Sequence, residues 1–147
     1  MIAHTIQLAL APVFVLVAIG NVMNILSTRL SRIVDRSRYL IERHGETEGT
    51  DHDAVVREMR MLDQRIAIIG RAIFTMLLSG LTIGVVIAML FLDGFTALNL
   101  QRATAVAFTV AIALMMYALL LFVRETRIAS ASLRIPHGLM EWHRQDL

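Results

Sequence analysis

The sequence contains no cysteine and no lysine, and only 18 % of its 147 residues are charged. Without cysteine the chain forms no disulfide and offers no thiol chemistry. All fourteen basic residues are arginines, and twelve acidic residues nearly balance them. Binding of nucleic acid is not expected, because it normally shows as a clustered excess of basic residues.

Motifs of several enzyme classes are also missing. No two histidines stand four residues apart, as on the helix of a zinc protease, and no histidine lies deep inside an apolar run, as in a membrane haem protein. There is no phosphate-binding glycine loop. We therefore expect neither an enzyme nor a cofactor.

The composition is otherwise strongly apolar, with 56 % hydrophobic residues and a mean hydropathy of +0.65. The apolar residues form three runs, at about 6–26, 72–92 and 103–123, and each has about the ~20 residues that a helix needs to cross a bilayer. The sequence predicts an all-α membrane protein that forms one integral-membrane domain over residues 1–147. Pro12 lies in the first run, where it either kinks the span or begins it.

Residues 27–71 keep a helical pattern on both sides of a polar turn at 44–50. This pattern predicts that the first and second helices extend beyond the membrane as an antiparallel helical hairpin. Gly45 is expected to end the first helix in a left-handed cap, and Thr50 to begin the second. The acids and histidines of the turn could collect a divalent cation, although a solvated turn is the simpler interpretation: His44, Glu46, Glu48, Asp51, His52 and Asp53.

The arginines predict the orientation in the membrane. Residues 27–71 hold nine of them and the segment 124–147 holds four, whereas the connection between the second and third runs holds Arg102 alone. The positive-inside rule places the hairpin and the C-terminal tail in the cytoplasm and the N-terminus outside. No basic residue precedes the first run, so we expect it to be a retained anchor and not a cleaved signal peptide. The third helix is predicted to continue to about Ile135, with Trp142 in the tail at the bilayer surface or against the hairpin.

Several segments resemble a known family. They are residues 2–14 (IAHTIQLALAPVF), 24–30 (NILSTRL), 32–38 (RIVDRSR) and 122–125 (FVRE). The sequence is similar here to small bacterial membrane proteins grouped as domain of unknown function 2721. The resemblance implies a protein of the bacterial inner (plasma) membrane with three spans, and it brings no activity or site residue with it.

A line of polar residues follows the first helix. Gln7, Asn21, Asn24, Thr28, Ser31 and Asp35 recur at spacings that place them near one face, with Phe14 and Ala18 filling the gap. Amides in hydrocarbon are costly unless they face protein or water. Two explanations remain open: hydrogen bonds to the neighbouring helices, or self-association around this helix.

Self-association would make the protein a homo-oligomeric ion channel or pore lined by the first helix. Phe14 would constrict this pore, and Asn21 and Asn24 would coordinate partly dehydrated ions. Arg29, Arg32 and Arg36 would set the potential at the cytoplasmic mouth. The partners implied are the lipid bilayer, further copies of the chain and inorganic ions.

A second hypothesis is a membrane-anchored scaffold that binds a partner through the hairpin face holding Arg57, Glu58, Arg60 and Asp63. Small residues at four-residue spacing further predict close helix packing in the second and third runs. They are Gly80, Gly84 and Ala88, and Ala103, Ala107 and Ala111.

Overall fold

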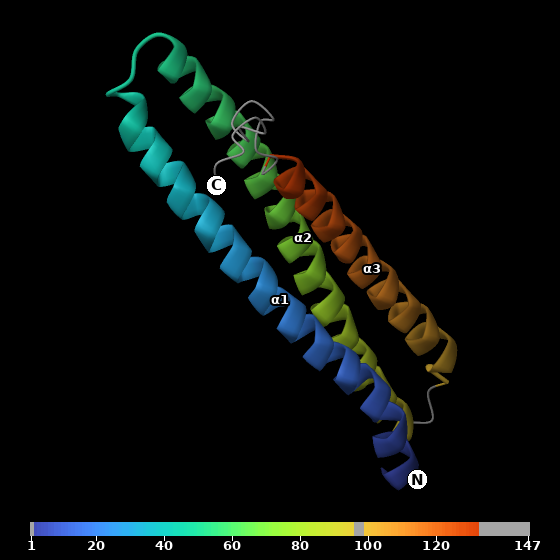
Figure 1. Cartoon of the computed structure of the whole chain (residues 1–147). Coiled ribbons are helices and arrows are strands. Elements are labelled where there is room, and N and C mark those ends of the chain that lie inside the picture. Colours follow the sequence, from blue (N-terminus) through green and yellow to red (C-terminus); the bar gives the residue numbers. More distant parts are fainter. Residues whose placement is uncertain (1, 96–98, 133–147) are drawn as a thin grey trace, which may run out of the picture.

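The structure, a computed structural model, describes residues 2–95 and 99–132, and this part of the chain forms three long α-helices (Figure 1). Helix α1 spans Ile2–His44, α2 spans Thr50–Phe95 and α3 spans Gln101–Ser132. Each helix has an apolar stretch long enough to cross a bilayer. The predicted all-helical class and the three candidate membrane spans are therefore confirmed. The predicted tail with Trp142 lies outside the described residues.

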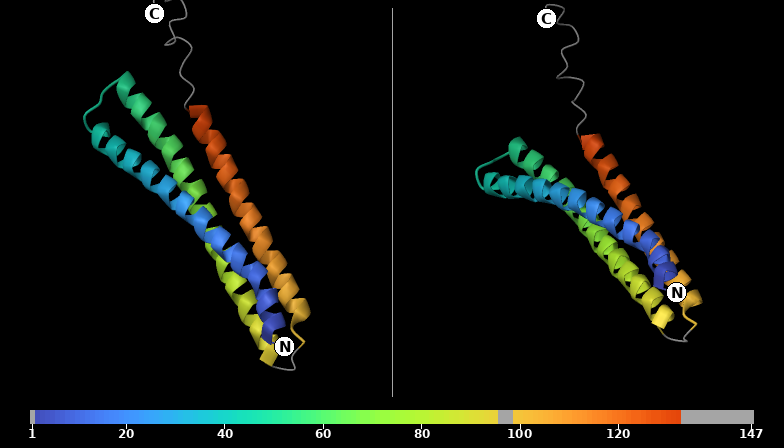
Figure 2. Two further views of the ribbon diagram at one scale, coloured as in Figure 1. Left: turned by 60° about the horizontal axis from the view of Figure 1, so that its bottom comes forward. Right: turned by 90° about the horizontal axis from the view of Figure 1, so that it is seen from below.

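Buried side chains recur every seven residues along α1 and α2. On α1 they are Ile19, Leu26, Ile33 and Leu40; on α2 they are Val55, Leu62, Ile69, Met76 and Ile83. A strict seven-residue repeat keeps one face of each helix against its partner when the helices wind around each other in a left-handed supercoil. This repeat explains why α2 runs back alongside α1 over most of its length (Figures 1 and 2).

Helix α3 packs against α2 through a second set of buried positions with the same spacing. On α2 they are Ala72, Ser79 and Val86, and on α3 they are Thr104, Ala111, Ala118 and Glu125. Most of these side chains are small, so the two backbones come close. The Ser79 hydroxyl donates a hydrogen bond of 2.7 Å to the carbonyl oxygen of Ala111. Helix α2 thus packs against both neighbours, whereas α1 and α3 approach each other less closely.

The turn between α1 and α2 differs in one detail from the prediction. Helix α1 ends at His44, next to Gly45, but Gly49 is the glycine with a left-handed backbone, at a φ of 65°. The amide of Glu46 instead bonds to the carbonyl oxygen of Arg43 at 3.0 Å, which closes the end of α1 without a left-handed residue. Glycine at position 49 lets the chain reverse directly before Thr50, where α2 begins as predicted.

Pro12 does not begin the first helix, because α1 continues through it from Ile2. At the opposite end of the molecule from the α1–α2 turn, the backbone amide of Leu100 bonds to Asp93 Oδ1 at 2.9 Å. This bond holds the start of α3 beside the end of α2.

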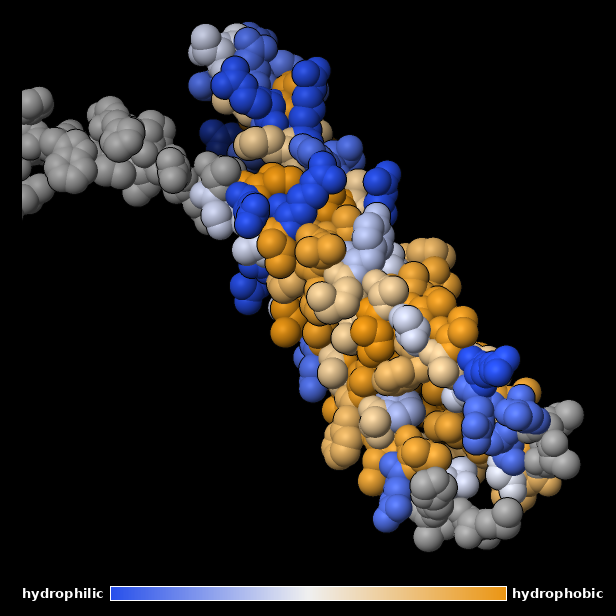
Figure 3. All heavy atoms as spheres, turned by 90° about the vertical axis from the view of Figure 1, so that its right-hand side faces the viewer, coloured by the Kyte–Doolittle hydropathy of each residue, from blue (hydrophilic) through white to orange (hydrophobic). Residues whose placement is uncertain are grey.

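Large apolar side chains cover the middle of the molecule, and polar ones gather toward both ends (Figure 3). Phe74, Leu81 and Leu120 are each more than 60 % exposed. Exposed apolar surface of this extent is expected to face lipid.

Candidate functional site

The predicted polar line lies on the outside of α1. Its residues, here named the α1 polar face, are all exposed: Gln7, Phe14, Ala18, Asn21, Asn24, Thr28, Ser31 and Asp35. Phe14 is 69 % exposed. Apolar side chains such as Val17 and Ile25 are exposed beside the polar ones, so the face is a polar stripe within an apolar surface.

One copy of the chain does not satisfy the amides of this face. The side chains of Gln7, Asn21 and Asn24 make no hydrogen bond to any residue in 2–95 or 99–132. The Thr28 hydroxyl bonds at 2.9 Å to the carbonyl oxygen of Asn24 in its own helix. Helices α2 and α3 therefore do not provide hydrogen-bond partners for these amides, which the first of the two explanations, bonds to neighbouring helices, requires.

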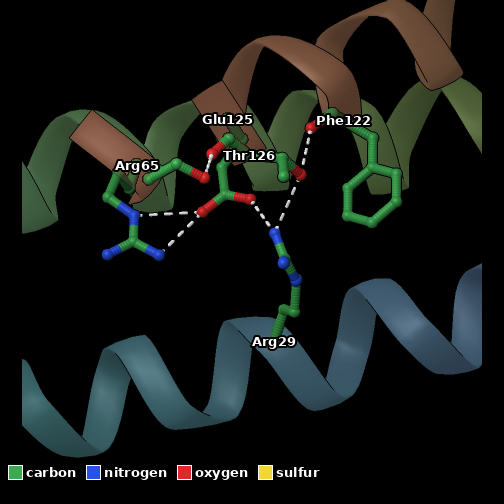
Figure 4. Close-up of polar contacts among 6 residues, drawn as sticks. Arg29, Arg65, Phe122, Glu125 and Thr126 are labelled. Atoms are coloured by element: carbon green, nitrogen blue, oxygen red, sulfur yellow. Dashed lines mark hydrogen bonds and ion pairs between the residues drawn. The ribbon is translucent and has the colours of Figure 1, made fainter. Parts of the chain in front are cut away.

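A buried carboxylate joins all three helices at the end of the apolar region. Glu125 of α3 has a side chain that is 0 % exposed. Its Oε2 accepts a hydrogen bond of 2.6 Å from Nη1 of Arg29 on α1, and its Oε1 accepts bonds of 3.0 and 2.8 Å from Nε and Nη2 of Arg65 on α2 (Figure 4). A buried charge needs such pairing, because desolvation of an unpaired carboxylate is very costly.

Neighbouring groups of α3 fix Arg29 further. Its Nη1 also donates to the Thr126 hydroxyl at 3.0 Å, and that hydroxyl donates to the carbonyl oxygen of Phe122 (Figure 4). The guanidinium carbon of Arg29 lies 5.1 Å from the centre of the Phe122 ring, within the range of a cation–π contact. We name Arg29, Arg65 and Glu125 the three-helix ion cluster.

Glu125 is not among the site residues predicted from the sequence, where it belongs only to the family-like segment 122–125. The sequence predicts Arg29 at a pore mouth and not in an ion cluster. The signal that identifies Glu125 is the spacing of seven from Ala111 through Ala118, which places this glutamate on the buried face of α3. An acid at such a position requires a cation from a neighbouring helix.

The three arginines predicted at the mouth have different surroundings. Arg29 turns toward α3, and Arg36 pairs with Glu58 of α2 through bonds of 2.8 and 3.1 Å. These bonds to Glu58 raise the pKa of Arg36 above its ordinary value. Arg32 is exposed on α1, and so is Asp35 of the polar face.

The predicted packing residues divide between buried and exposed positions. Gly80 faces Ile19 of α1, whose Cγ2 would lie 3.6 Å from a Cβ at position 80. Ala111 is buried and Ala107 is half-buried, but Ala103 is exposed. Gly84 and Ala88 are exposed and line an apolar groove of about 720 Å³ between α1 and α2.

The α1–α2 turn shows no metal site in the described part of the chain. The rings of His44 and His52 lie 4.4 Å apart, centre to centre. No group of three or more histidine, aspartate or glutamate side chains within 2–95 and 99–132 is arranged to hold a metal ion.

Comparison with known proteins gives one match. No curated protein and no solved structure was found to be similar to the chain. A family described as "Protein of unknown function (DUF2721)" matches residues 9–135, which include α1 from Ala9 onward, all of α2 and α3, and the ion cluster. The chain therefore belongs to the DUF2721 family of proteins of unknown function.

Proposed function

We propose that the protein is a homo-oligomeric channel or pore of the bacterial inner membrane, lined by the α1 polar face. The observation that carries the proposal is the exposure of Asn21 and Asn24 without hydrogen-bond partners among the described residues. Both lie in the part of α1 that is apolar enough to span the membrane. Further copies of the chain, arranged around a common axis, would supply the missing partners or enclose water.

In this arrangement the amides of Gln7, Asn21 and Asn24 line a hydrated path, and Phe14 forms its narrowest ring. The positions of the arginines support a cytoplasmic location for residues 27–71 and for the C-terminus. Arg32 and Asp35 are then the charged residues at the cytoplasmic mouth. Arg29 and Arg36 contribute less there, because both are paired with acids on other helices.

The proposal is tested by ion flux from vesicles that contain the purified protein. We expect flux in the wild type and a changed rate or selectivity in Asn21→Leu and Asn24→Leu. Thr109→Val is the matched control, since Thr109 is an exposed polar residue of α3 whose hydroxyl bonds only within its own helix. Tight vesicles under varied voltage, pH and membrane tension, or a particle with a single copy in native mass spectrometry, would refute the proposal.

A second candidate function is a membrane-anchored scaffold. Arg57, Arg60 and Asp63 are exposed on the charged part of α2, and the first two border a shallow groove of about 420 Å³ together with Met61. Glu58 is not available to a partner on this face, because it pairs with Arg36. Charge reversal of Arg57, Arg60 and Asp63 in the full chain should abolish binding of a specific partner, and Asn21→Leu should not. Partners that remain bound after the reversal would exclude this role.

A further inference from the structure

Helix α3 diverges from the other two helices after Glu125. Up to residue 130, where burial is described, Glu125 is the last buried residue of α3, and residues 126–130 are half-buried or exposed. Beside this end of α3 a cleft of about 520 Å³ opens, lined by Ile128 and Ala129 of α3, by one arginine of α1 and by side chains of α2.

The segments of α1 and α2 beyond this point form one packed body, which we name the charged half (residues 27–71). Its interior is an apolar cluster of Ile33, Leu40, Val55, Leu62 and Ile69. The pair formed by Arg36 and Glu58 adds a second link between the two helices. Figure 1 shows the charged half projecting past the end of α3, and Figure 2 shows the two diverging from each other there.

Glu125 and Thr126 beside it make polar contacts that join α3 to the charged half. Glu125 holds α2 through Arg65 and α1 through Arg29. A buried ion cluster is not needed for stability as such, because apolar side chains of similar volume often stabilise a protein equally well or better. Unlike an apolar contact, an ion cluster is held by directional hydrogen bonds, which favour one arrangement of its members. Arg29 can leave, since 36 % of its side chain is exposed.

We propose that Glu125 is a positioning residue whose bond to Arg29 breaks and re-forms, and that the charged half pivots about Glu125 relative to α3 when it does. We name this breakable contact the tie. The tie sets the position of α1. Because α1 is one helix from Ile2 to His44, a movement of the charged half reaches the α1 polar face in the membrane. This last consequence rests on the proposed function, whereas the tie itself does not.

The test measures distances between pairs of spin labels in lipid nanodiscs. The chain has no cysteine of its own, so labels attach only at introduced cysteines. One pair, Arg38→Cys and Ser130→Cys, reports the distance from the charged half to α3, and a second pair, Arg38→Cys and Arg60→Cys, reports on the charged half alone. All three positions are exposed.

We expect Arg29→Gln and Glu125→Gln to broaden or shift the distances of the 38–130 pair and to leave the 38–60 pair unchanged. Arg29→Gln is the gentler variant, because Glu125 keeps its bonds to Arg65. Arg32→Gln is the matched control and should give wild-type distances for both pairs, because Arg32 is exposed on α1. Wild-type distances for the 38–130 pair in both variants would overturn the proposal, as would an equal change in the 38–60 pair.

Flux measurements separate this inference from the proposed function. Altered 38–130 distances in a protein that conducts no ions would reject the proposed channel and support the tie. Unchanged distances in a protein whose flux responds to Asn21→Leu would reject the tie and keep the channel.

Discussion

Replacement of Glu125 by glutamine should destabilise the protein strongly. Glutamine has nearly the same shape as glutamate, but it lacks the negative charge. In the wild type this charged carboxylate accepts three hydrogen bonds from the guanidinium groups of Arg29 and Arg65. Loss of one partner from a buried ion pair costs about 3–5 kcal/mol. Water reaches part of Arg29, which lowers the penalty, so we expect a loss of about 2–4 kcal/mol in the free energy of unfolding.

The assay is reversible unfolding in mixed micelles, followed by circular dichroism. An apolar triple variant provides the comparison: with Arg29→Met, Arg65→Met and Glu125→Leu together, no buried charge is left unpaired. Its free energy of unfolding should lie within about 1 kcal/mol of the wild type, or above it. The reasoning about burial and pairing is refuted if the free energy of unfolding of Glu125→Gln alone lies within about 0.5 kcal/mol of the wild-type value, which is the range of an ordinary surface substitution.

Three further predictions concern other contacts. Ser79→Ala removes the bond to the Ala111 carbonyl and should cost about 1 kcal/mol. Ser79→Leu loses the same bond and also overpacks the α2–α3 contact, so its total cost should be about 2–4 kcal/mol; similar values for the two in the same unfolding assay would contradict the close packing. Gly49→Ala places a Cβ on a left-handed residue and should cost about 1 kcal/mol, visible as faster proteolysis of the turn; unchanged proteolysis would argue against the left-handed backbone. Arg36→Gln should cost at most about 1 kcal/mol, and less at high salt, because its pair with Glu58 is exposed. The bonds to Glu58 raise the pKa of Arg36, so the stability that this pair contributes is fully present at every pH below the ordinary pKa of arginine. A loss of stability between pH 7 and 10 traced to this residue would contradict the pairing.

Much of the fold can be predicted from the sequence because membrane spans depend on local composition. A run of about twenty apolar residues forms a helix in lipid whatever the rest of the chain does, because only within a helix are all backbone N–H and C=O groups of the segment hydrogen-bonded to one another. The helical pattern on both sides of the polar turn likewise contains Leu40 and Val55, which the structure buries in one cluster. Helix α2 begins at Thr50, as the sequence predicts, although the amide of Asp53 bonds to the carbonyl oxygen of Gly49 at 3.3 Å and not to the Thr50 hydroxyl.

The ion cluster could not be predicted in the same way, because it depends on how three helices are aligned along one another. Glu125 stands next to Arg124 in the sequence, where a charged pair flanking a span normally faces water. The spacing of seven from Ala118 indicates that Glu125 turns inward only once the packing of α3 on α2 shows that Ala118 is buried, and Arg124 beside it stays exposed. The partners of Arg29 and Arg65 are 96 and 60 residues away along the chain, respectively. Likewise, a choice between Gly45 and Gly49 for the left-handed position depends on the path of the turn and not on residue type.

The seven-residue spacing has a consequence for changes in chain length. A single residue inserted into α1 between Ile33 and Leu40 would rotate everything after it by about 100°, and Leu40 would leave the apolar cluster that it shares with Val55 and Leu62. Seven residues, or about two turns, added to α1 and matched by seven in α2 would keep the same faces in contact and only lengthen the charged half. Relatives with a longer or shorter charged half should therefore differ by matched multiples of seven.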